Sequence, residues 1–403
     1  MTKSILESGI PLVGIPATLH DSLMARLDRL ASVRLVAQIG AAIGRQFPYV
    51  LLRAVSALPE DELHAALVRL VASELVFQRG TPPDAVYSFK HALVQDAAHG
   101  SLLRSSRQQL HARIAEALEV HSPELMDSQP ELFAQHYAEA GLVEKSVDYW
   151  GKAGHRSAAR SAMAEAAAQF QRGIDQLAQL PDRPERQRRE LELFSALGPA
   201  LMAVKGNAAP ETGQAYARAR KLWDQLGSPS EFLRIPYGQQ AHHAGRGEYE
   251  LALRLDEDLL RVSRQRNDSA GLVLGHLASG RNLLMTGRFA PSRSHLEAAL
   301  ALYDPNSHRS LGRQIGFHPN VNSRFSLGLA LFVLGFPDQA FAQISAAISE
   351  ARRLAHPQSL AGSLAVGGIL LSLLGEKEAT LGEWADQLVA LATEQGFPYW
   401  RAQ

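Results

Sequence analysis

Apolar and polar positions alternate with the period of amphipathic helices along most of the chain. In the segment 16–31, leucines recur on one face, and Arg26, Asp28 and Arg29 lie opposite them. The same spacing predicts four helices in the first hundred residues, at 16–31, 33–42, 48–56 and after Pro59. The chain is therefore expected to begin with a group of short helices.

The period changes at Leu75. The stretches 75–80 and 85–90 are rich in β-forming residues and flank the turn 81–84, which contains two prolines. They predict one β-hairpin, and several short helices followed by one hairpin predict a small winged-helix-like domain over residues 1–103. In this interpretation His91 begins the helix that follows the hairpin.

From about Leu102 onward no strand is expected, and helical periodicity is interrupted by glycine, proline and asparagine. Three of these glycines, Gly287, Gly335 and Gly375, lie 48 and 40 residues apart within matched surroundings. Each has a glycine seven positions before it, a leucine four before, a small residue five after, and large apolar residues nine and thirteen after. The matched columns are Gly280, Gly328 and Gly368; Leu283, Leu331 and Leu371; Ser292, Ala340 and Thr380; Leu296, Ile344 and Trp384; and Leu300, Ile348 and Leu388.

These columns predict a repeated pair of helices joined by a glycine turn. Glycine allows the sharp reversal, and the earlier glycine lets the paired helix approach closely. Gly141 and Gly247 anchor two weaker copies, which lack the earlier glycine. The pattern resembles tetratricopeptide repeats, in copies longer than the usual period of about 34 residues. We therefore expect a mainly α fold, with linking helices and a first helix pair over 104–180 and an α-solenoid, incomplete at the C-terminus, over 181–403.

Composition narrows the classes of function. The chain has 403 residues, with 41 basic and 41 acidic side chains, so it has no net charge to attract nucleic acid or an anionic membrane. The absence of cysteine excludes disulfides, thiolate metal sites and a cysteine nucleophile, and it fits a cytoplasmic protein. The stretch 356–375 carries no formal charge, but it contains serines and glycines and lies inside the repeat. We expect it to be a buried helix rather than a membrane span.

No motif for catalysis stands out. The sequence contains no phosphate-binding G-x-x-x-x-G-K-[ST] loop, no G-x-G-x-x-G after a strand, no G-x-S-x-G and no H-E-x-x-H. The fifteen histidines are scattered, and none forms an i, i+4 pair. We therefore expect no metal site, no cofactor and no enzymatic activity from this chain alone.

The segment Phe89–Leu103 nevertheless gathers polar residues in an apolar frame. His91 and His99 are eight positions apart and could share a helix face, whereas Asp96 lies on another side. An acid–base constellation is one interpretation, and helix capping or an interdomain polar contact is the one that we favour. We take Lys90, His91 and Asp96 as candidate interdomain contacts.

The helix before the hairpin argues against DNA binding. Winged helices often bind DNA through a basic recognition helix. The segment 61–74 has Arg69 as its basic residue against Asp61, Glu62 and Glu74, which makes a poor partner for phosphate. We expect no nucleic-acid partner.

Several strings resemble the C-terminal part of bacterial adenylate/guanylate cyclase-type proteins. They are IPATLHDSLMARLDRL, YSFKHALVQDAAHGSLL, RQQLHARIAEALE, QPELFAQHYAEAGLVEKSVDYWGKAG and LGFPDQA, and the likeness extends over nearly the whole chain. In that family a cyclase domain precedes a STAND-type (AAA-like) predicted ATPase, which is followed by a winged helix and tetratricopeptide repeats. The family usually has tyrosine where His99 stands and Asp-Pro where His318-Pro319 stands.

The resemblance implies a non-catalytic regulatory arm of a signalling cyclase/ATPase. The cyclase domain and the phosphate loop have no counterpart here, so the family's catalytic residues have no positions to match, and the chain resembles a fragment. The expected partner is an adjacent ATPase/cyclase module or another protein, with no membrane involved. Two alternatives remain open, namely the sensor arm of a STAND-class transcription regulator and a stand-alone repeat adaptor.

Overall fold

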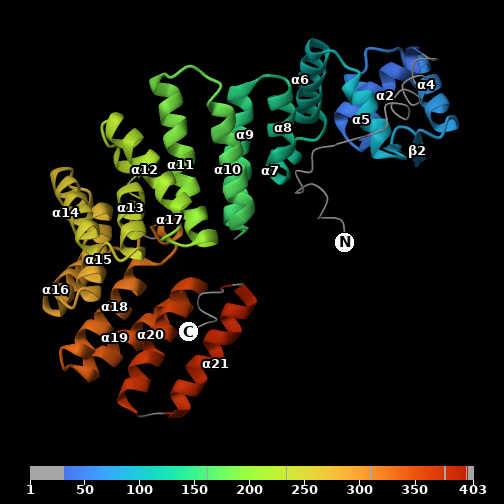
Figure 1. The fold of residues 1–403 in the computed structure, drawn as a ribbon. Helices are drawn as coiled ribbons and strands as arrows, with labels where there is room; N and C mark the ends of the chain where they lie inside the picture. Colours follow the sequence, from blue (N-terminus) through green and yellow to red (C-terminus); the bar gives the residue numbers. More distant parts are fainter. Residues whose placement is uncertain are drawn as a thin grey trace. The chain divides into compact units, whose positions relative to one another are not determined.

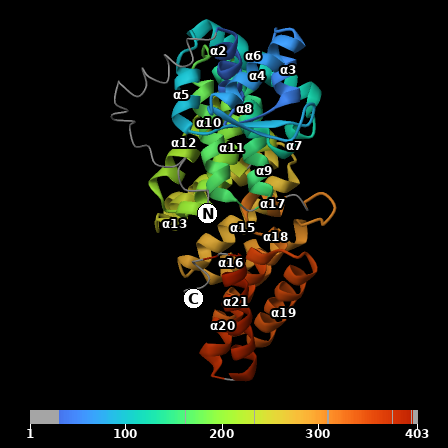
Figure 2. The same cartoon turned by 90° about the vertical axis from the view of Figure 1, so that its right-hand side faces the viewer.

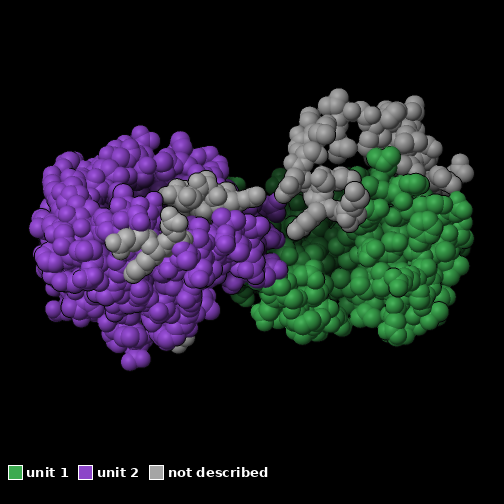
Figure 3. Space-filling view, turned by 90° about the horizontal axis from the view of Figure 1, so that it is seen from below, with its two compact units in different colours: residues 1–156, 175–180 green, residues 157–174, 181–403 purple. Residues whose placement is uncertain are grey.

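The computed structural model describes residues 31–160, 162–232, 234–308, 311–375, 378–395 and 397. Most of the helix expected over 16–31 lies outside these residues. The chain divides into two compact units (Figure 3). Unit 1 comprises residues up to 156 and 175–180, and unit 2 comprises 157–174 and 181 onward.

Unit 1 begins with short helices around a small antiparallel sheet. Its first elements are α2 (Ala31–Ile43), β1 (Gln46–Pro48), α3 (Tyr49–Val55), α4 (Glu60–Ala72), β2 (Val76–Arg79), β3 (Val86–Phe89) and α5 (Ala92–Gly100). The strand order is β1-β3-β2, with Gln46 opposite Ser88 and Val76 opposite Phe89. The three helices predicted between residues 33 and 72 and the hairpin are confirmed, and His91 does precede α5. The winged-helix assignment itself stays a prediction.

The strand β1 was not foreseen. It is three residues long and pairs with β3, so no alternating pattern could reveal it. Phe47 at its centre is fully buried, and its ring lies against Gly40 of α2, where a Cβ would come within 2.8 Å of the ring. The third strand therefore depends on a tertiary contact.

Unit 1 continues through a set of longer helices. They are α6 (Arg104–His121), α7 (Leu125–Ser128), α8 (Pro130–Glu139) and α9 (Val143–Ala159), the last of which crosses into unit 2. One apolar core joins them to the first elements, from Val33 to Ala153. Packing is thus continuous across residue 103, where we placed a domain boundary, and the three-part division of the chain remains a prediction.

Unit 2 consists of helices in the described residues. After α10 (Met163–Leu177), which crosses the boundary between the units, they are α11 (Pro184–Lys205), α12 (Pro210–Gln225), the 3-10 turn η1 (Ser230–Phe232), α13 (Arg234–Gly245), α14 (Tyr249–Gln265), α15 (Ser269–Met285), α16 (Phe289–Leu302), α17 (Leu311–Ile315), α18 (Pro319–Val333), α19 (Pro337–Arg353), α20 (Pro357–Leu374) and α21 (Glu378–Gln395). Figures 1 and 2 show α18–α21 (orange to red) as neighbouring helices of successive pairs. The predicted mainly α, solenoid class is confirmed.

The helices of unit 2 pack in two layers. From α11 to α16 and from α18 to α21 each helix contacts the next one, and α16 contacts α18. The first helices of successive pairs also contact one another, as α11–α13, α13–α15, α15–α18 and α18–α20. The second helices of the pairs are further apart in the described part of the chain. Because only the first helices come this close, α11, α13, α15, α18 and α20 form the inner layer of the solenoid.

An inserted segment explains the 48-residue spacing between Gly287 and Gly335. Between α16 and α18 the chain contains α17, whose Leu311 packs with Tyr237 and Leu274. His308 bonds Ser269 Oγ through Nε2 at 2.9 Å, so it fixes the insert to the start of α15. The next interval, from Gly335 to Gly375, lacks such an insert and has 40 residues.

One helix, α20, is long and apolar enough to cross a membrane by length and composition. It packs against α18, α19 and α21, and Ala361, Leu364 and Leu370 are fully buried or nearly so. The helix thus has the contacts of a repeat helix within unit 2, as the sequence predicted.

Candidate functional site

The five predicted turn glycines each lie between two helices and have positive φ. The values are 74° at Gly141, 78° at Gly247, 75° at Gly287, 88° at Gly335 and 64° at Gly375. Glycine adopts this region without the steric cost that a Cβ imposes. These residues therefore set the reversals that bring each helix pair together.

Two copies of the repeat close their helix pairs as the matched columns predict. A Cβ on Gly280 would lie 2.6 Å from Leu296 Cγ, and one on Gly328 would lie 2.9 Å from Ile344 Cδ1. Ser292 also donates a hydrogen bond to the carbonyl of Gly280 at 2.7 Å. In the Gly141 copy, Ser146 makes the equivalent bond to Ala134 at 2.8 Å. The residue seven positions before the turn glycine thus packs against the residues five and nine positions after it.

The third copy requires a correction. Gly368, which the columns matched to Gly280 and Gly328, has space around it, since a Cβ there would lie 3.6 Å from Leu381. The close approach occurs instead at Gly367, where a Cβ would lie 2.5 Å from the Trp384 ring. The residue that packs there is an indole, which is wider than leucine or isoleucine, and the glycine that meets it stands one position earlier in α20.

The Gly247 copy fills the same columns with polar residues. Gln240 stands seven positions before Gly247, and Asp256 stands nine after it; both are buried. Asn282 of α15 donates to Gln240 Oε1 at 3.0 Å and to Asp256 Oδ2 at 2.7 Å. We call Gln240, Asp256 and Asn282 the inner polar cluster, and its three members come from α13, α14 and α15.

Asp256 is the most constrained member of the inner polar cluster. Its side chain is fully buried, and Oδ1 has no hydrogen-bond partner. Burial raises the pKa of this carboxyl well above its ordinary value, although the bond from Asn282 and the charge of Arg281 oppose the shift. The cluster lies between α13, α14 and α15, and it places polar contacts where the other copies of the repeat have apolar ones.

The C-terminal ends of three inner helices expose apolar side chains at one position. Two residues before the turn glycine stand Met285, Val333 and Leu373, whose exposed fractions are 54%, 49% and 66%. Single exposed apolar residues are common on proteins. Here they recur in register on α15, α18 and α20, and neighbours in this series contact each other. We call these three residues the turn-end row.

Lys90, His91 and Asp96 do not converge in unit 1. Lys90 pairs with Glu74 at 3.3 Å and lies over the Phe77 ring. His91 precedes α5 without capping it through its side chain, and both His91 and Asp96 are exposed. Within the described part of the chain neither of these two side chains forms a hydrogen bond or an ion pair, and their interdomain role stays a prediction.

His99 belongs to a chain of three histidines that sequence reasoning missed; His111 and His136 are buried and His99 is half-buried. His99 Nε2 lies 3.3 Å from His111 Nε2, and His111 Nδ1 lies 2.9 Å from His136 Nδ1. The three residues, which we call the histidine chain, come from α5, α6 and α8. Spacings of 12 and 25 residues carry no periodic signal, so only the fold reveals the contact.

The histidine chain is neutral at ordinary pH. Burial lowers the pKa of His111 to about 3, assisted by the charges of His136, His99 and Arg107. Burial lowers the pKa of His136 to about 4. A neutral ring can donate through one nitrogen and accept through the other, which suits a line of three rings. No group of three potential metal ligands converges among the described residues, and the two ring contacts here are successive rather than convergent.

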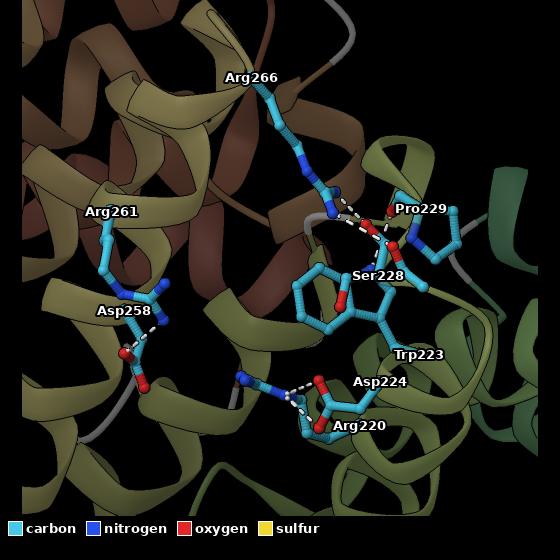
Figure 4. Close-up of polar contacts among 9 residues, drawn as sticks. Arg220, Trp223, Asp224, Ser228, Pro229, Asp258, Arg261 and Arg266 are labelled. Atoms are coloured by element: carbon cyan, nitrogen blue, oxygen red, sulfur yellow. Dashed lines mark hydrogen bonds and ion pairs between the residues drawn. The ribbon is translucent and has the colours of Figure 1, made fainter.

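The polar contacts around the connection after α12 hold helix pairs in place (Figure 4). Arg266, just after α14, donates to the carbonyls of Gly227 and Ser228, and Trp223 Nε1 donates to Pro229 O at 2.8 Å. Arg220 pairs with Asp224 at 3.1 Å and lies over the Trp223 ring. Backbone carbonyls and nearby carboxylates satisfy these arginines, so this cluster is structural.

Comparisons with known proteins agree on the fold. No family model matches the chain. An uncharacterized protein of Rhizobium meliloti (strain 1021) is 28% identical over 352 residues, which cover 85% of this chain and 33% of that protein. The chain thus spans about a third of the length of the curated relative that it matches.

Two solved structures share the helical architecture. A Rap protein complexed with competence and sporulation factor is 12% identical, with a TM-score of 0.50 over 93% of this chain and 89% of that one. The Rap conjugation gene regulator of the plasmid pLS20, in complex with a Phr peptide, is 11% identical, with a TM-score of 0.50 over 71% and 80%. At these identities the likeness shows the fold.

Proposed function

We propose that this chain is a non-catalytic regulatory arm whose solenoid binds an apolar segment of a partner protein along the ends of α15, α18 and α20. The turn-end row carries the proposal. Solvent exposure of large apolar side chains is unfavourable by about 25 cal/mol per Å². Three such residues at one register of successive repeats offer a partner a periodic set of apolar contacts.

Two further observations support a role in binding. Stacked helix pairs create extended surfaces, and this is how solenoid proteins commonly recognise partners. The two Rap structures were solved with a bound factor and a bound peptide. A peptide or an extended protein segment is therefore the class of partner that we propose for this chain.

We further propose that the arm belongs to a longer signalling protein of the adenylate/guanylate cyclase type with a STAND-type ATPase. The resemblance of the strings around Phe89–Leu103 supports this, and the relative is about three times as long as the region it shares with this chain. His91 and Asp96 are exposed and are suited to contact a neighbouring module. Alternatives are the sensor arm of a STAND-class transcription regulator and a stand-alone adaptor.

The experiment selects peptides from a random phage-displayed library on the immobilised full chain and compares variants of the turn-end row. We expect the double variant Val333→Ser, Leu373→Ser to bind the selected peptides at least tenfold more weakly. Loss of two buried apolar contacts of about 1 kcal/mol each exceeds the 1.4 kcal/mol that corresponds to tenfold.

The matched control is Val120→Ser, which alters a side chain of unit 1 that is 74% exposed. This control should bind the peptides as the wild type does, and all variants should melt at similar temperatures because the altered residues are exposed. Selection of no peptide, or equal binding by the double variant, would refute the proposal.

A further inference from the structure

A second set of side chains lies one helical turn before the turn-end row. Six positions before the turn glycine stand Arg281 on α15, Leu329 on α18 and Ile369 on α20, each four residues before its member of the turn-end row. Residues four apart lie on the same face of a helix. Arg281 is exposed, Ile369 is 46% exposed and Leu329 is half-buried. We call these three residues the second row.

The two rows form one surface because their helices are neighbours. α15 contacts α18, and α18 contacts α20. Between Ala270 and Met285 the exposed residues of α15 are Arg281 and Met285, so this pair makes up the exposed face of that part of the helix. On α13, the inner helix that contacts α15 on its other side, the same two positions are Ala241 and Gly245. The surface is therefore an apolar strip with Arg281 as the charged group at its α15 end.

The inner helices around this strip separate the two signs of charge. α13, α15, α18 and α20 contain three arginines and no aspartate, glutamate or lysine; the arginines are Arg234, Arg281 and Arg324. The second helices contain both signs and form ion pairs within α12, α14, α16 and α19, namely Arg220–Asp224, Arg261–Asp258, Arg293–Glu297 and Arg353–Glu350. The whole chain has 41 basic and 41 acidic side chains, so the positive excess belongs to these inner helices and not to the composition.

None of the three inner arginines forms an ion pair with a described residue. Two of them are half-buried and donate to neutral side chains, Arg234 to Ser195 Oγ and Arg324 to Gln343 Oε1, both at 3.0 Å. Arg281 is the exposed one. The charge of Arg281 reaches the buried carboxyl of Asp256, but burial raises the pKa of that carboxyl well above its ordinary value, which makes Asp256 a weak counter-ion.

We propose that Arg281 binds a carboxylate of the partner segment and thereby fixes the direction in which the segment lies, with its acidic residue at α15 and its apolar residues on α18 and α20. This inference rests on the proposed peptide binding and adds the chemistry of the ligand. A guanidinium presents paired donors that match the two oxygens of a carboxylate. The positive inner helices favour an acidic segment over a basic one by charge complementarity.

The spacing of the helices sets the spacing of the ligand. Packed helices lie about 8–10 Å apart. An extended chain rises about 3.3 Å per residue. The apolar residues that reach α18 and α20 should therefore stand about three and about six positions from the acidic residue.

The test selects peptides from a random phage-displayed library on the full chain and on Arg281→Glu. We expect the wild type to enrich peptides with aspartate or glutamate at this spacing from apolar residues, and Arg281→Glu to enrich lysine or arginine at the position of the acid. Arg281 is exposed, so its variants should fold, and unchanged melting temperatures will establish this. Enrichment of the same acidic residue by both proteins would overturn the proposal.

A selected peptide and its counterpart with an amide in place of the acid then measure the contact. The wild type should bind the amide form at least tenfold more weakly, whereas Arg281→Gln should bind both forms with about equal affinity. The matched control is Arg261→Gln, which alters an exposed arginine of α14 that pairs with Asp258 at 3.0 Å and should keep the preference of the wild type. If Arg281→Gln keeps the full preference for the acidic form, the assignment of Arg281 is wrong.

The outcomes separate this inference from the proposed function. Selected peptides that lack an acidic residue, and that lose affinity for the double variant Val333→Ser, Leu373→Ser, would overturn the role of Arg281 and leave the peptide-binding surface standing. Selection of no peptide would overturn both proposals. In that case a dimer of the chain in sedimentation that the double variant dissociates would identify a second copy as the occupant of the strip.

Discussion

Each unit of the molecule contains a polar cluster that joins three helices and is largely buried, and the two clusters differ in the groups that they bury. In unit 1 the histidine chain links α5, α6 and α8 through neutral rings. In unit 2 the inner polar cluster links α13, α14 and α15 through a carboxyl, an amide and a second amide. Burial opposes charge in both places, so the histidines resist gaining a proton and Asp256 resists losing one.

The two clusters should therefore respond to pH with opposite signs. In the histidine chain the folded pKa values are depressed, so the unfolded state binds more protons below its pKa of about 6.5. Unit 1 is then fully stable above that pH and loses stability as the pH falls toward 4. For Asp256 the folded pKa is raised, so its contribution is complete below about pH 4 and is lost as the pH rises through the folded pKa.

The largest effect that we predict is the acid sensitivity of unit 1. A ring whose pKa falls from about 6.5 to about 4 costs roughly 3 kcal/mol of unfolding free energy at pH 4 relative to pH 7, since each pKa unit is worth about 1.4 kcal/mol. His136→Asn keeps a hydrogen-bonding atom near Nδ1 but removes the titration, so it should remove the share of the loss that His136 contributes, while the lowered pKa of His111 keeps the remainder. Hydrogen exchange of α6 peptides between pH 7 and pH 4, corrected for intrinsic rates, measures the change.

Peptides from α14 provide the internal reference in the same samples. Their protection should increase, not decrease, as the pH falls from 7 toward 4, and Asp256→Asn should flatten that trend. The exposed His91 supplies a control, because His91→Asn should leave the acid response of α6 unchanged. If α6 and α14 lose protection in parallel on acidification, the contrast between the clusters is wrong.

A smaller effect should follow from removing the shared donor of the inner polar cluster. Asn282→Ala leaves the buried oxygens of Gln240 and Asp256 without their donor, and a buried unsatisfied group costs about 1–3 kcal/mol. We expect a loss of about 2 kcal/mol for unit 2 in urea denaturation.

A triple variant tests whether the loss comes from polarity rather than from packing. Gln240→Gly, Asp256→Leu and Asn282→Ala together install the residue types that the other copies use at these positions. Replacing a buried polar network by apolar groups of suitable shape is often neutral or stabilising. The triple variant should therefore be more stable than Asn282→Ala alone. If it is less stable, the Gly247 copy has a geometry of its own that the other repeats do not share.

The sequence predicted the regular contacts of the repeat better than the positions at which a copy departs from the pattern. Spacing alone located the turn glycines and the contacts of Gly280 with Leu296 and Gly328 with Ile344, because a helix pair joined by a fixed turn brings fixed positions together. It misplaced the third contact by one residue, at Gly368 instead of Gly367, where the Trp384 ring packs. Matched positions in the repeat copies carry no information about the size of the side chain at each position.

The polar clusters were less accessible to sequence reasoning, for two different reasons. Gln240 and Asp256 occupy the columns of the Gly247 copy, so extending the column count to that copy would have identified them as polar exceptions. His111 and His136 occupy no shared column with His99, and their contact depends on how α6 and α8 pack in unit 1. Local periodicity holds no information about that packing.

The smallest predicted effect concerns a histidine and an aspartate that lie at the surface of unit 1. His91 and Asp96 lie on or beside α5, as His99 does, yet both are exposed. Truncation of an exposed residue usually changes stability by no more than about 0.5 kcal/mol. His91→Ala and Asp96→Ala should therefore melt within about a degree or two of the wild type, while His99→Ala, which breaks the histidine chain, should melt clearly lower. Thermal unfolding at pH 7 compares the three variants. If His91→Ala unfolds the chain, burial does not separate the two sets of residues, and His91 belongs to the core of unit 1 rather than to a surface free to contact a partner.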